Sequence, residues 1–418
     1  MGPPATGPCR SGARPRERTR GAIAPRYIFY MPQPPVYLDH AASTPVRQEV
    51  LEAMLPYFTT KFGNASSAHR WGREARAATD AARERIAACL GAHPDEICLT
   101  SGGTEADNLA VLGGWRVQQG NRRPGIVSTP IEHKAVIEAV HQAAREGGDE
   151  RLLRIDPAGT VNLDAARQHI RDDVSLVSVM WVNNETGVIQ PVAELAALAK
   201  EAGAIFHTDA VQAFGKLDVD LRRLPADFLS VSGHKFGAPK SIGAVFVRRG
   251  TPLAPLFFGG SQDRGRRPGT ENTPLAVALA TAMELTLQER DVEVARLRAL
   301  RDRLQALLTA ALPELVVHGR DAARVPHILH LSVPGTDSES LLMALDLQGI
   351  AASSGSACQS GSITPSHVLS AMGLPPALGA SAVRMSVGKL TDDEQITHVA
   401  AVFPEAVRSA RAMTGTFA

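Results

Sequence analysis

A lysine at the end of a predicted strand is the residue in this chain best suited to covalent chemistry. The stretch Asp227–Lys235 reads D-F-L-S-V-S-G-H-K, an apolar run typical of a buried strand followed by a turn that contains a glycine. Lys235 is therefore expected at the carboxyl end of a strand, where open α/β sheets bind their ligands. An amine whose pKa is lowered in such surroundings can form a Schiff base. Taken alone, this pattern more often marks a solvated lysine just past a strand, and the residues that follow the other strands reverse that interpretation.

Polar residues also follow four other predicted strands. Gly103 and Thr104 follow Glu96–Thr100, His133 follows Gly125–Thr129, Asn183 follows Ser175–Val182, and Asp209 with Gln212 follows Ala204–Thr208. A single aspartate there is usually a helix cap and a single histidine a satisfied core residue, but four successive strands favour one common site. Ser232 and His234 add to it. The set suits a phosphorylated pyridine cofactor: a lysine attaches it, a carboxylate keeps its ring nitrogen protonated, and hydroxyls with a helix N-terminus bind its phosphate.

The order of the predicted elements indicates the fold class. Short apolar strands, continued by Asp227–Val231 and Ala244–Val247, alternate with amphipathic helices such as Ala135–Glu146 and Val192–Glu201. This alternation is typical of a mainly parallel sheet. Two helical stretches, Val46–Phe58 and Ala68–Leu90, precede it, and a long one runs from Pro274 to about Leu312. The remaining strands, near Val316, Ile328–Val333 and Val383–Val387, predict a second, smaller α/β domain.

Composition describes an ordinary globular protein of 418 residues, with 44% hydrophobic and 21% charged residues. The formal net charge of +1 gives no general attraction to nucleic acid or to an anionic membrane. No run of about 18 apolar residues predicts a membrane span. The four cysteines are Cys9, Cys89, Cys98 and Cys358, without a C-x-x-C pair or a cluster with metal-ligand spacing. This usage is typical of a reducing cytoplasm, in which one of them can be a reactive thiol.

Residues 1–35 are rich in Pro, Gly and Arg and are predicted to be disordered. Six arginines and one glutamate among residues 1–30 contribute +5, which leaves the body of the chain at about −4. An acid-poor, Arg-rich start is also typical of a transit peptide. Met31 directly precedes the first folded motif, so a start codon assigned too early is an equally good interpretation.

The motifs together resemble those of pyridoxal-phosphate-dependent cysteine desulfurases of the NifS/IscS type, a group of the class V aminotransferases. The similarity runs from about Val36 to Val402, and its motifs are Y-L-D-H-A-A-S-T-P, G-N-A-S-S, T-S-G-G-T-E-A-D-N, E-H-K-A-V, V-N-N-E-T-G, H-T-D-A-V-Q, S-G-H-K, R-P-G-T-E-N and S-S-G-S-A-C. The resemblance implies the aspartate aminotransferase-like fold of PLP-dependent transferases, with a mainly parallel seven-stranded sheet. We expect residues 46–290 to form the large PLP-binding domain. Residues 36–45 and 291–418 are expected to form the small domain with the catalytic cysteine loop.

The resemblance also implies a role for each site residue. Lys235 would form the internal aldimine, Asp209 would pair with the pyridine nitrogen, and Gln212 would reach the ring hydroxyl. His133 would stack on the ring and relay protons. Residues expected at the phosphate are Gly103, Thr104, Ser232 and His234, joined by Thr270 of the neighbouring subunit of a homodimer. Asn183 and Arg384 would bind the substrate carboxylate, since a guanidinium can hold it with two hydrogen bonds.

Cys358 is expected to be the catalytic thiol. Cys89 ends an alanine-rich helix and Cys98 lies in an apolar strand, so both are interpreted as buried small side chains. Cys358 instead lies in S-S-G-S-A-C-Q-S-G-S, a segment without an anchoring apolar residue, which is predicted to be mobile. With the resemblance, this predicts that the Cys358 thiolate takes the sulfur of L-cysteine as a persulfide and that L-alanine is released.

The expected partners follow from this activity. They are L-cysteine, a second subunit, and sulfur acceptors for iron-sulfur cluster assembly or tRNA thiolation, with Cys358 also a candidate transient ligand of an iron-sulfur cluster. Direct binding to nucleic acid, a membrane or a resident metal is not expected. Two alternatives stay open: a selenocysteine lyase or another class V aminotransferase, and a non-enzymatic sulfur carrier that uses only Cys358.

Overall fold

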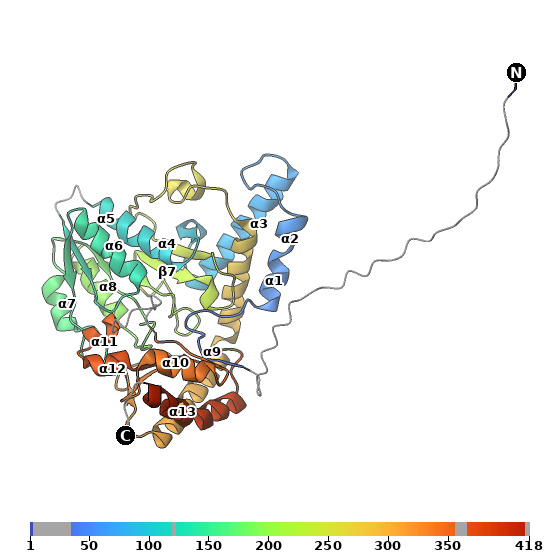
Figure 1. Cartoon of the computed structure of the whole chain (residues 1–418). Helices are drawn as coiled ribbons and strands as arrows, with labels where there is room; N and C mark the ends of the chain where they lie inside the picture. Colours follow the sequence, from blue (N-terminus) through green and yellow to red (C-terminus); the bar gives the residue numbers. More distant parts are fainter. Residues whose placement is uncertain (3–34, 119–122, 356–365, 414–418) are drawn as a thin grey trace. The chain divides into compact units, whose positions relative to one another are not determined.

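The computed structural model describes residues 1–2, 35–118, 123–355 and 366–413 (Figure 1). Its helices are α1 Gln48–Met54, α2 Pro56–Thr59, α3 Arg70–Leu90, α4 Gly103–Asn108, α5 Gly114–Arg116, α6 Lys134–Arg145, α7 Leu163–His169, α8 Val192–Glu201, α9 Thr273–Ala311, α10 Ser338–Asp346, α11 His367–Ala371, α12 Pro376–Ala380 and α13 Asp393–Met413, with short helical turns η1 Pro94–Glu96, η2 Leu109–Gly113, η4 Gly233–Lys235 and η5 Gln262–Gly265. Its strands are β1 Val36–Tyr37, β2 Ile97–Thr100, β3 Gly125–Ser128, β4 Asp149–Leu152, β5 Val174–Ser178, β6 Ile205–Asp209, β7 Phe228–Ser232, β8 Gly243–Val247, β9 Val316–Val317, β10 Ile328–Ser332, β11 Ile350–Ala351 and β12 Ala382–Ser386. The predicted disorder of residues 1–35 falls almost wholly outside these ranges.

Within the described residues, the main sheet has seven strands in the order β2-β8-β7-β6-β5-β3-β4. The strands from β7 to β4 are mutually parallel, whereas β8 runs antiparallel to β7 and to β2. The predicted mainly parallel seven-stranded sheet is thus confirmed. The carboxyl ends of the parallel strands meet at one edge, which brings together the residues that follow them.

Alternating residues of the strands pack on opposite faces of this sheet. On β8, Ala244 and Phe246 belong to the apolar core on one face, whereas Val245 and Val247 belong to the core on the other. Because successive side chains of a strand point to opposite faces, a strand buried on both sides reads as a continuous apolar run. The edge strand β4 was not predicted, because its sequence D-E-R-L is mostly charged and half exposed.

Local sequence signals explain where the longest helices begin and end. Helix α3 ends at Gly91, whose φ of +67° is the left-handed conformation that glycine adopts without a steric cost. The Asn272 side chain accepts a hydrogen bond from the Leu275 N–H and caps α9, which packs along α3 and α1 (Figure 1). The stretch Val46–Phe58, predicted as one helix, forms two, and the second begins at Pro56, a residue favoured at the first position of a helix.

A separate three-stranded antiparallel sheet, in the order β12-β10-β9, lies in the C-terminal part of the described chain. Its core joins residues of β10 and β12 to apolar residues of the second half of α9 and of α10 and α13. Val36 and Leu38 from the start of the folded chain belong to the same core, and β1 pairs in parallel with β11. The division into a large domain of residues 46–290 and a small domain of residues 36–45 and 291–418 stays a prediction.

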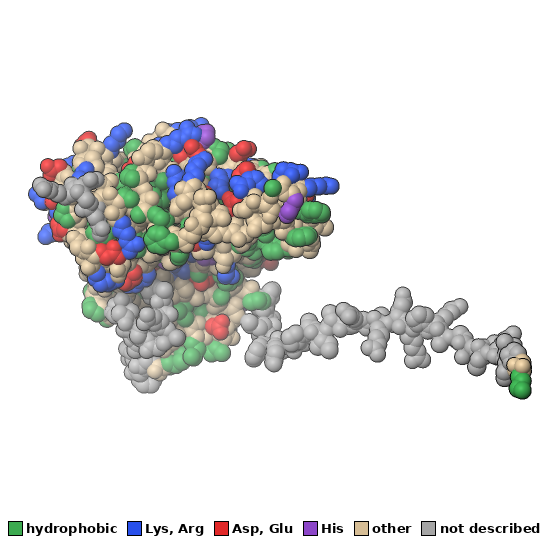
Figure 2. Space-filling model, turned by 90° about the horizontal axis from the view of Figure 1, so that it is seen from above, with side chains coloured by type: hydrophobic (Ala, Val, Ile, Leu, Met, Phe, Trp, Pro, Cys, Tyr) green, Lys and Arg blue, Asp and Glu red, His purple; other side chains and the backbone are tan. Residues whose placement is uncertain are grey.

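None of the helices in the described parts of the chain has the length and apolar character needed to cross a bilayer. On the face shown in Figure 2, Lys and Arg side chains are interspersed with Asp and Glu side chains. This mixture agrees with the near-neutral net charge of the sequence.

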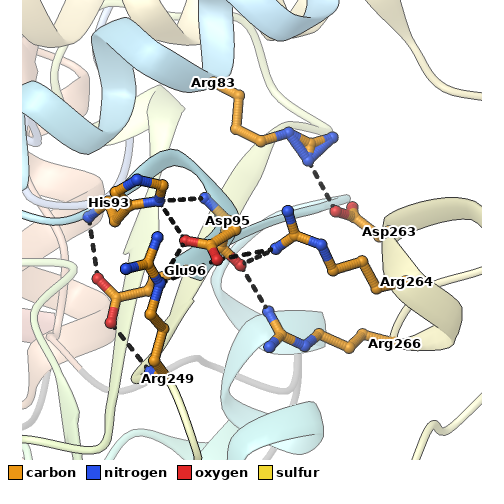
Figure 3. A network of polar contacts seen from close by, with 8 residues as sticks. All are labelled: Arg83, His93, Asp95, Glu96, Arg249, Asp263, Arg264 and Arg266. Atoms are coloured by element: carbon orange, nitrogen blue, oxygen red, sulfur yellow. Dashed lines mark hydrogen bonds and ion pairs between the residues drawn. The ribbon is translucent and has the colours of Figure 1, made fainter.

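An arginine network holds the loop that contains η5 against η1 and α3 (Figure 3). Asp263 has a φ of +49°, an uncommon conformation for a residue other than glycine. Its carboxylate accepts hydrogen bonds from Arg83 Nη1 at 2.8 Å and from the Leu99 N–H at 3.2 Å. Arg83 Nη2 also donates to Glu271 at 3.2 Å. One arginine therefore pairs with two largely buried carboxylates at either end of this loop.

Replacing Arg83 should destabilise the protein strongly. Arg83→Met leaves two partly buried carboxylates without their cation, which typically costs about 3 kcal/mol or more of unfolding free energy. The matched control is Arg70→Met, since the Arg70 side chain is 80% exposed in its pair with Glu74 and its removal should cost less than about 0.5 kcal/mol. Urea unfolding of both variants gives the comparison, and equal stabilities would contradict the structural role of Arg83.

Candidate active site

A cavity of about 480 Å³ opens where the parallel strands end, and it collects most of the residues predicted from the sequence. Its lining includes Gly103, Thr104, His133, Asp209, Gln212, Ser232, His234, Lys235 and Arg384. Cys358 lies outside the described residues. Asn183 and Thr270 are described but do not line the cavity.

Lys235 lies in the turn η4, directly after β7. Its Nζ donates hydrogen bonds to the carbonyls of Ala41 at 2.7 Å and Ala42 at 2.9 Å. Burial lowers the pKa of Lys235 to about 8, and the nearby charge of Arg384 acts in the same direction. A larger fraction of this amine is therefore neutral, and so nucleophilic, near pH 7 than for an exposed lysine.

Asp209 ends β6 and is almost fully buried, with 6% of its surface exposed. Its carboxylate accepts a hydrogen bond from the Val211 N–H at 2.8 Å. Burial raises the pKa of Asp209, whereas His133 and Lys235 favour its charged form. A buried carboxylate beside two basic groups is suited to hold a cationic ring nitrogen.

His133 caps α6, where its Nδ1 accepts a hydrogen bond from the Ala135 N–H at 3.2 Å. Gln212 donates from Nε2 to the Ala41 carbonyl at 2.9 Å, so this carbonyl accepts from both Gln212 and Lys235. Burial lowers the pKa of His133, and it lowers the pKa of His234 to about 4. Both imidazoles are therefore neutral near pH 7, and each can donate one N–H.

Further carboxylates that the sequence did not single out surround Asp209. Asp107, on α4, lines the cavity, and its side chain is 3.6 Å from His207 Nε2. Glu132 accepts hydrogen bonds from Thr129 Oγ1 at 2.6 Å and from the Met180 N–H, and burial raises its pKa to about 8. Burial also raises the pKa of Asp107, with Asp209 as the next cause. These groups hold protons that the exposed side chains would lose.

Arg384 comes from β12, in the small sheet, and reaches the cavity from the opposite part of the chain. Its Nη1 donates to the Asn184 carbonyl at 2.8 Å and its Nη2 to Asp39 at 2.7 Å. Its Nε has no hydrogen-bond partner among the described residues. Arg384 thus lines the cavity with a guanidinium that two neighbours hold in place, and a guanidinium suits a carboxylate ligand.

Asn183 is fully buried in the turn between β5 and α8, and its amide is used there. Its Nδ2 donates to the Ile131 carbonyl at 2.9 Å, and its Oδ1 accepts from the Thr186 N–H at 2.9 Å. The neighbouring Asn184 lines the cavity instead. The binding of substrate by Asn183 stays a prediction, and its position in the turn gives that prediction no support.

Glu185 contacts the two residues that flank the segment 356–365. Its Oε2 accepts a hydrogen bond from Ser366 Oγ at 2.5 Å. Gly355 has a φ of +85°, and a Cβ added to it would lie 3.4 Å from the Cβ of Glu185. The motif V-N-N-E-T-G contained Glu185, but nothing in the sequence alone connected it to a segment about 180 residues away.

Glu185 should give the protein a measurable pH dependence. Burial raises its pKa from 4.5 to about 7, so the folded state keeps this proton after the unfolded chain has lost it. The free energy of unfolding should therefore fall as pH rises from about 4.5 to 7, on the order of 3 kcal/mol for this group. Glu185→Gln cannot lose a proton, so its stability relative to wild type should improve between pH 5 and pH 8 in chemical denaturation. Glu194→Gln, at an exposed site, is the control. If the stability of Glu185→Gln relative to wild type were the same at pH 5 and at pH 8, the raised pKa of Glu185 would be contradicted.

Three comparisons place the chain among known proteins. The family model described as aminotransferase class V matches residues 36–399. A cysteine desulfurase of Sinorhizobium fredii is 45% identical over 386 residues, which cover 92% of this chain and 99% of the relative. The cysteine desulfurase NifS of Azotobacter vinelandii is 43% identical, with 90% and 93% covered. A solved structure titled NifS-like protein, 33% identical, superposes with a TM-score of 0.82 and covers 92% of this chain and 100% of its own.

Proposed function

Because this chain belongs to the class V aminotransferase family and is a cysteine desulfurase that uses pyridoxal phosphate, we propose that it releases sulfur from L-cysteine through a persulfide on Cys358. The observation that carries the proposal is the convergence of Lys235, Asp209 and Arg384 on one cavity. An amine, a buried carboxylate and a guanidinium with a free donor are the groups that this chemistry requires.

The residues of the cavity fit the cofactor. Asp209 is the buried partner for the pyridine nitrogen, and Lys235 is the amine for covalent attachment. Thr104, Ser232 and His234 supply donors for the phosphate, beside Gly103, where an added Cβ would lie 3.1 Å from Val211 Cγ2. When bound, the pyridine ring supplies an electron sink next to the α-carbon of the amino acid.

The side chains of the protein perform the remaining tasks. Arg384 binds the substrate carboxylate, since its guanidinium lines the cavity and hydrogen bonds to Asp39 and Asn184 hold it in place. Lys235 takes the α-proton of the substrate, and His133, which lines the same cavity, relays it. The Cys358 thiolate attacks the sulfur of L-cysteine, so that an S–S bond forms as the C–S bond breaks. The β-carbon takes up a proton, the α-carbon receives its proton back from Lys235, and L-alanine leaves.

The persulfide sulfur then passes to an acceptor protein for iron-sulfur cluster assembly or tRNA thiolation. We assign this reaction to the cytoplasm, because a reducing compartment keeps the Cys358 thiol free for attack. The free cysteines Cys89 and Cys98 are in keeping with this assignment.

Mutants of the two covalent residues should fail in different ways. Lys235→Ala should lose all turnover, because neither cofactor attachment nor proton transfer has its amine. Cys358→Ala should keep the cofactor absorbance and still respond to L-cysteine, but should release no L-alanine and carry no persulfide. Absorbance spectra, an alanine assay and mass spectrometry of the protein distinguish these cases. Cys89→Ala, which removes another thiol, should keep the wild-type rate.

The result for Cys358→Ala also decides between the alternatives. Alanine production at the wild-type rate would exclude the persulfide route and favour a lyase of the selenocysteine type. A protein that binds no cofactor and still carries sulfur would be a thiol carrier.

We also propose a homodimer in which Thr270 of one subunit donates a hydrogen bond to the cofactor phosphate of the other. Thr270 is exposed and lies outside the cavity of its own chain, which agrees with a role in a second one. Thr270→Ala should then weaken cofactor binding without abolishing it, since a hydrogen bond to a charged group contributes about 1.5–3 kcal/mol. Thr251→Ala, at a threonine that does not line the cavity, is the control. In analytical ultracentrifugation, holo-protein should dissociate at lower concentration than apo-protein, and equal values would contradict the shared site.

A further inference from the structure

A second cavity, of about 330 Å³, shares Lys235 with the active-site cavity. It lies where the beginning of the folded chain, the turn after β6, helix α9 and the strands β10 and β12 meet. Its charged lining residues are Arg47, Glu49, Lys216, Lys235, Glu289, Arg290, Glu293 and Lys389, so cations exceed carboxylates. None of the steps assigned above to the active site uses this cavity.

Lys216 is a lining cation of this cavity that forms no ion pair among the described residues. It follows Gly215, and its ammonium forms no hydrogen bond or ion pair with any residue in the described parts of the chain. Glu293 is the carboxylate that acts on it electrostatically, but Arg296 already binds Glu293 at 2.7 and 2.9 Å. Burial lowers the pKa of Lys216, so the ammonium is held in this cavity at a cost.

The other cations of the cavity differ from Lys216. Arg47 Nη2 donates to Glu289 at 2.5 Å, and Lys389 Nζ donates to the same carboxylate at 2.9 Å. Arg290 pairs with Asp218 at 2.9 Å. Glu289 thus pairs with two of these cations, whereas Lys216 pairs with none of the described carboxylates.

Two buried imidazoles in the same lining also lack partners. His40 and His327 are each only 4% exposed. Neither ring nitrogen of His40, nor Nδ1 of His327, has a hydrogen-bond partner among the described residues. Lys216, His40 and His327 all line this one cavity. Neutral imidazoles offer N–H donors, and unpaired buried polar groups are uncommon without a ligand or water.

We infer that this cavity binds a small oxyanion, a carboxylate or an inorganic phosphate or sulfate, at the ammonium of Lys216, with the imidazoles of His40 and His327 in the surrounding wall. A bound cation is disfavoured by the excess of positive charge, and an apolar ligand would leave the three polar side chains unpaired. His40 directly precedes Ala41, whose carbonyl accepts from Lys235 and Gln212. The anion would therefore lie next to the residues that hold the catalytic lysine.

Calorimetric titration of the holoenzyme at constant ionic strength tests this inference. Sodium phosphate, sodium sulfate and sodium acetate are titrated separately, and at least one should bind saturably with one site per chain. Lys216→Met should lower its affinity at least about tenfold, because a charged donor is lost. Lys216→Arg keeps the charge and should retain binding. Lys389→Met, which removes a lining cation already paired with Glu289, should change the affinity less than about threefold.

Each outcome decides the inference without any measurement of turnover. Binding of acetate alone identifies a carboxylate ligand, and binding of phosphate or sulfate alone identifies an inorganic oxyanion. Lack of saturable binding in wild type would overturn the site and leave water as the occupant. Unchanged affinity in Lys216→Met, or in Lys216→Gln if the first variant does not fold, would overturn it as well. Loss of cofactor absorbance on adding the anion would place the anion at the cofactor phosphate instead.

Discussion

The hydrogen bonds of Lys235 to the carbonyls of Ala41 and Ala42 join segments 194 and 193 residues apart. They fix the amine at the end of β7 against the beginning of the folded chain. The Ala41 carbonyl also accepts a hydrogen bond from Gln212 Nε2, and the Ala41 N–H donates to Ser386 Oγ at 2.8 Å. The large sheet, the first motif and the small sheet are thus connected through one backbone segment, and the position of the reactive lysine depends on all three.

Burial gives these groups their chemistry, because it disfavours charge unless a partner is present. It lowers the pKa of Lys235, raises that of Asp209, and keeps His133 neutral. The same physical cause therefore produces a more nucleophilic amine, a carboxyl that is stabilised by a cationic partner, and an imidazole able to exchange protons. A cofactor that brings a cationic ring nitrogen and a phosphate matches these requirements.

The small sheet contributes the guanidinium for which we propose binding of the substrate carboxylate. Arg384 lies on β12, and its hydrogen bonds to Asn184 and Asp39 cross from that sheet to the turn after β5 and to the first motif. Glu185, in the same turn, contacts Gly355 and Ser366 at either end of the cysteine segment. The turn V-N-N-E-T-G thereby connects Arg384 to the ends of the segment that contains Cys358, whereas the side chain of its first asparagine stabilises the turn itself.

The sequence by itself determined the alternation of strands and helices, because the spacing of apolar residues and the turn residues act locally. It also determined most of the cavity lining, because the carboxyl ends of parallel strands meet at one edge of the sheet. It did not predict β4, a mostly charged strand at the edge of the sheet. It also did not predict that the helical stretch Val46–Phe58 divides into two helices at Pro56. Only the tertiary structure decided that Asn183 turns inward, that Glu185 meets Ser366, and that Lys216 forms no ion pair among the described residues. Those outcomes depend on contacts between distant segments and on the burial they create, which no local pattern encodes.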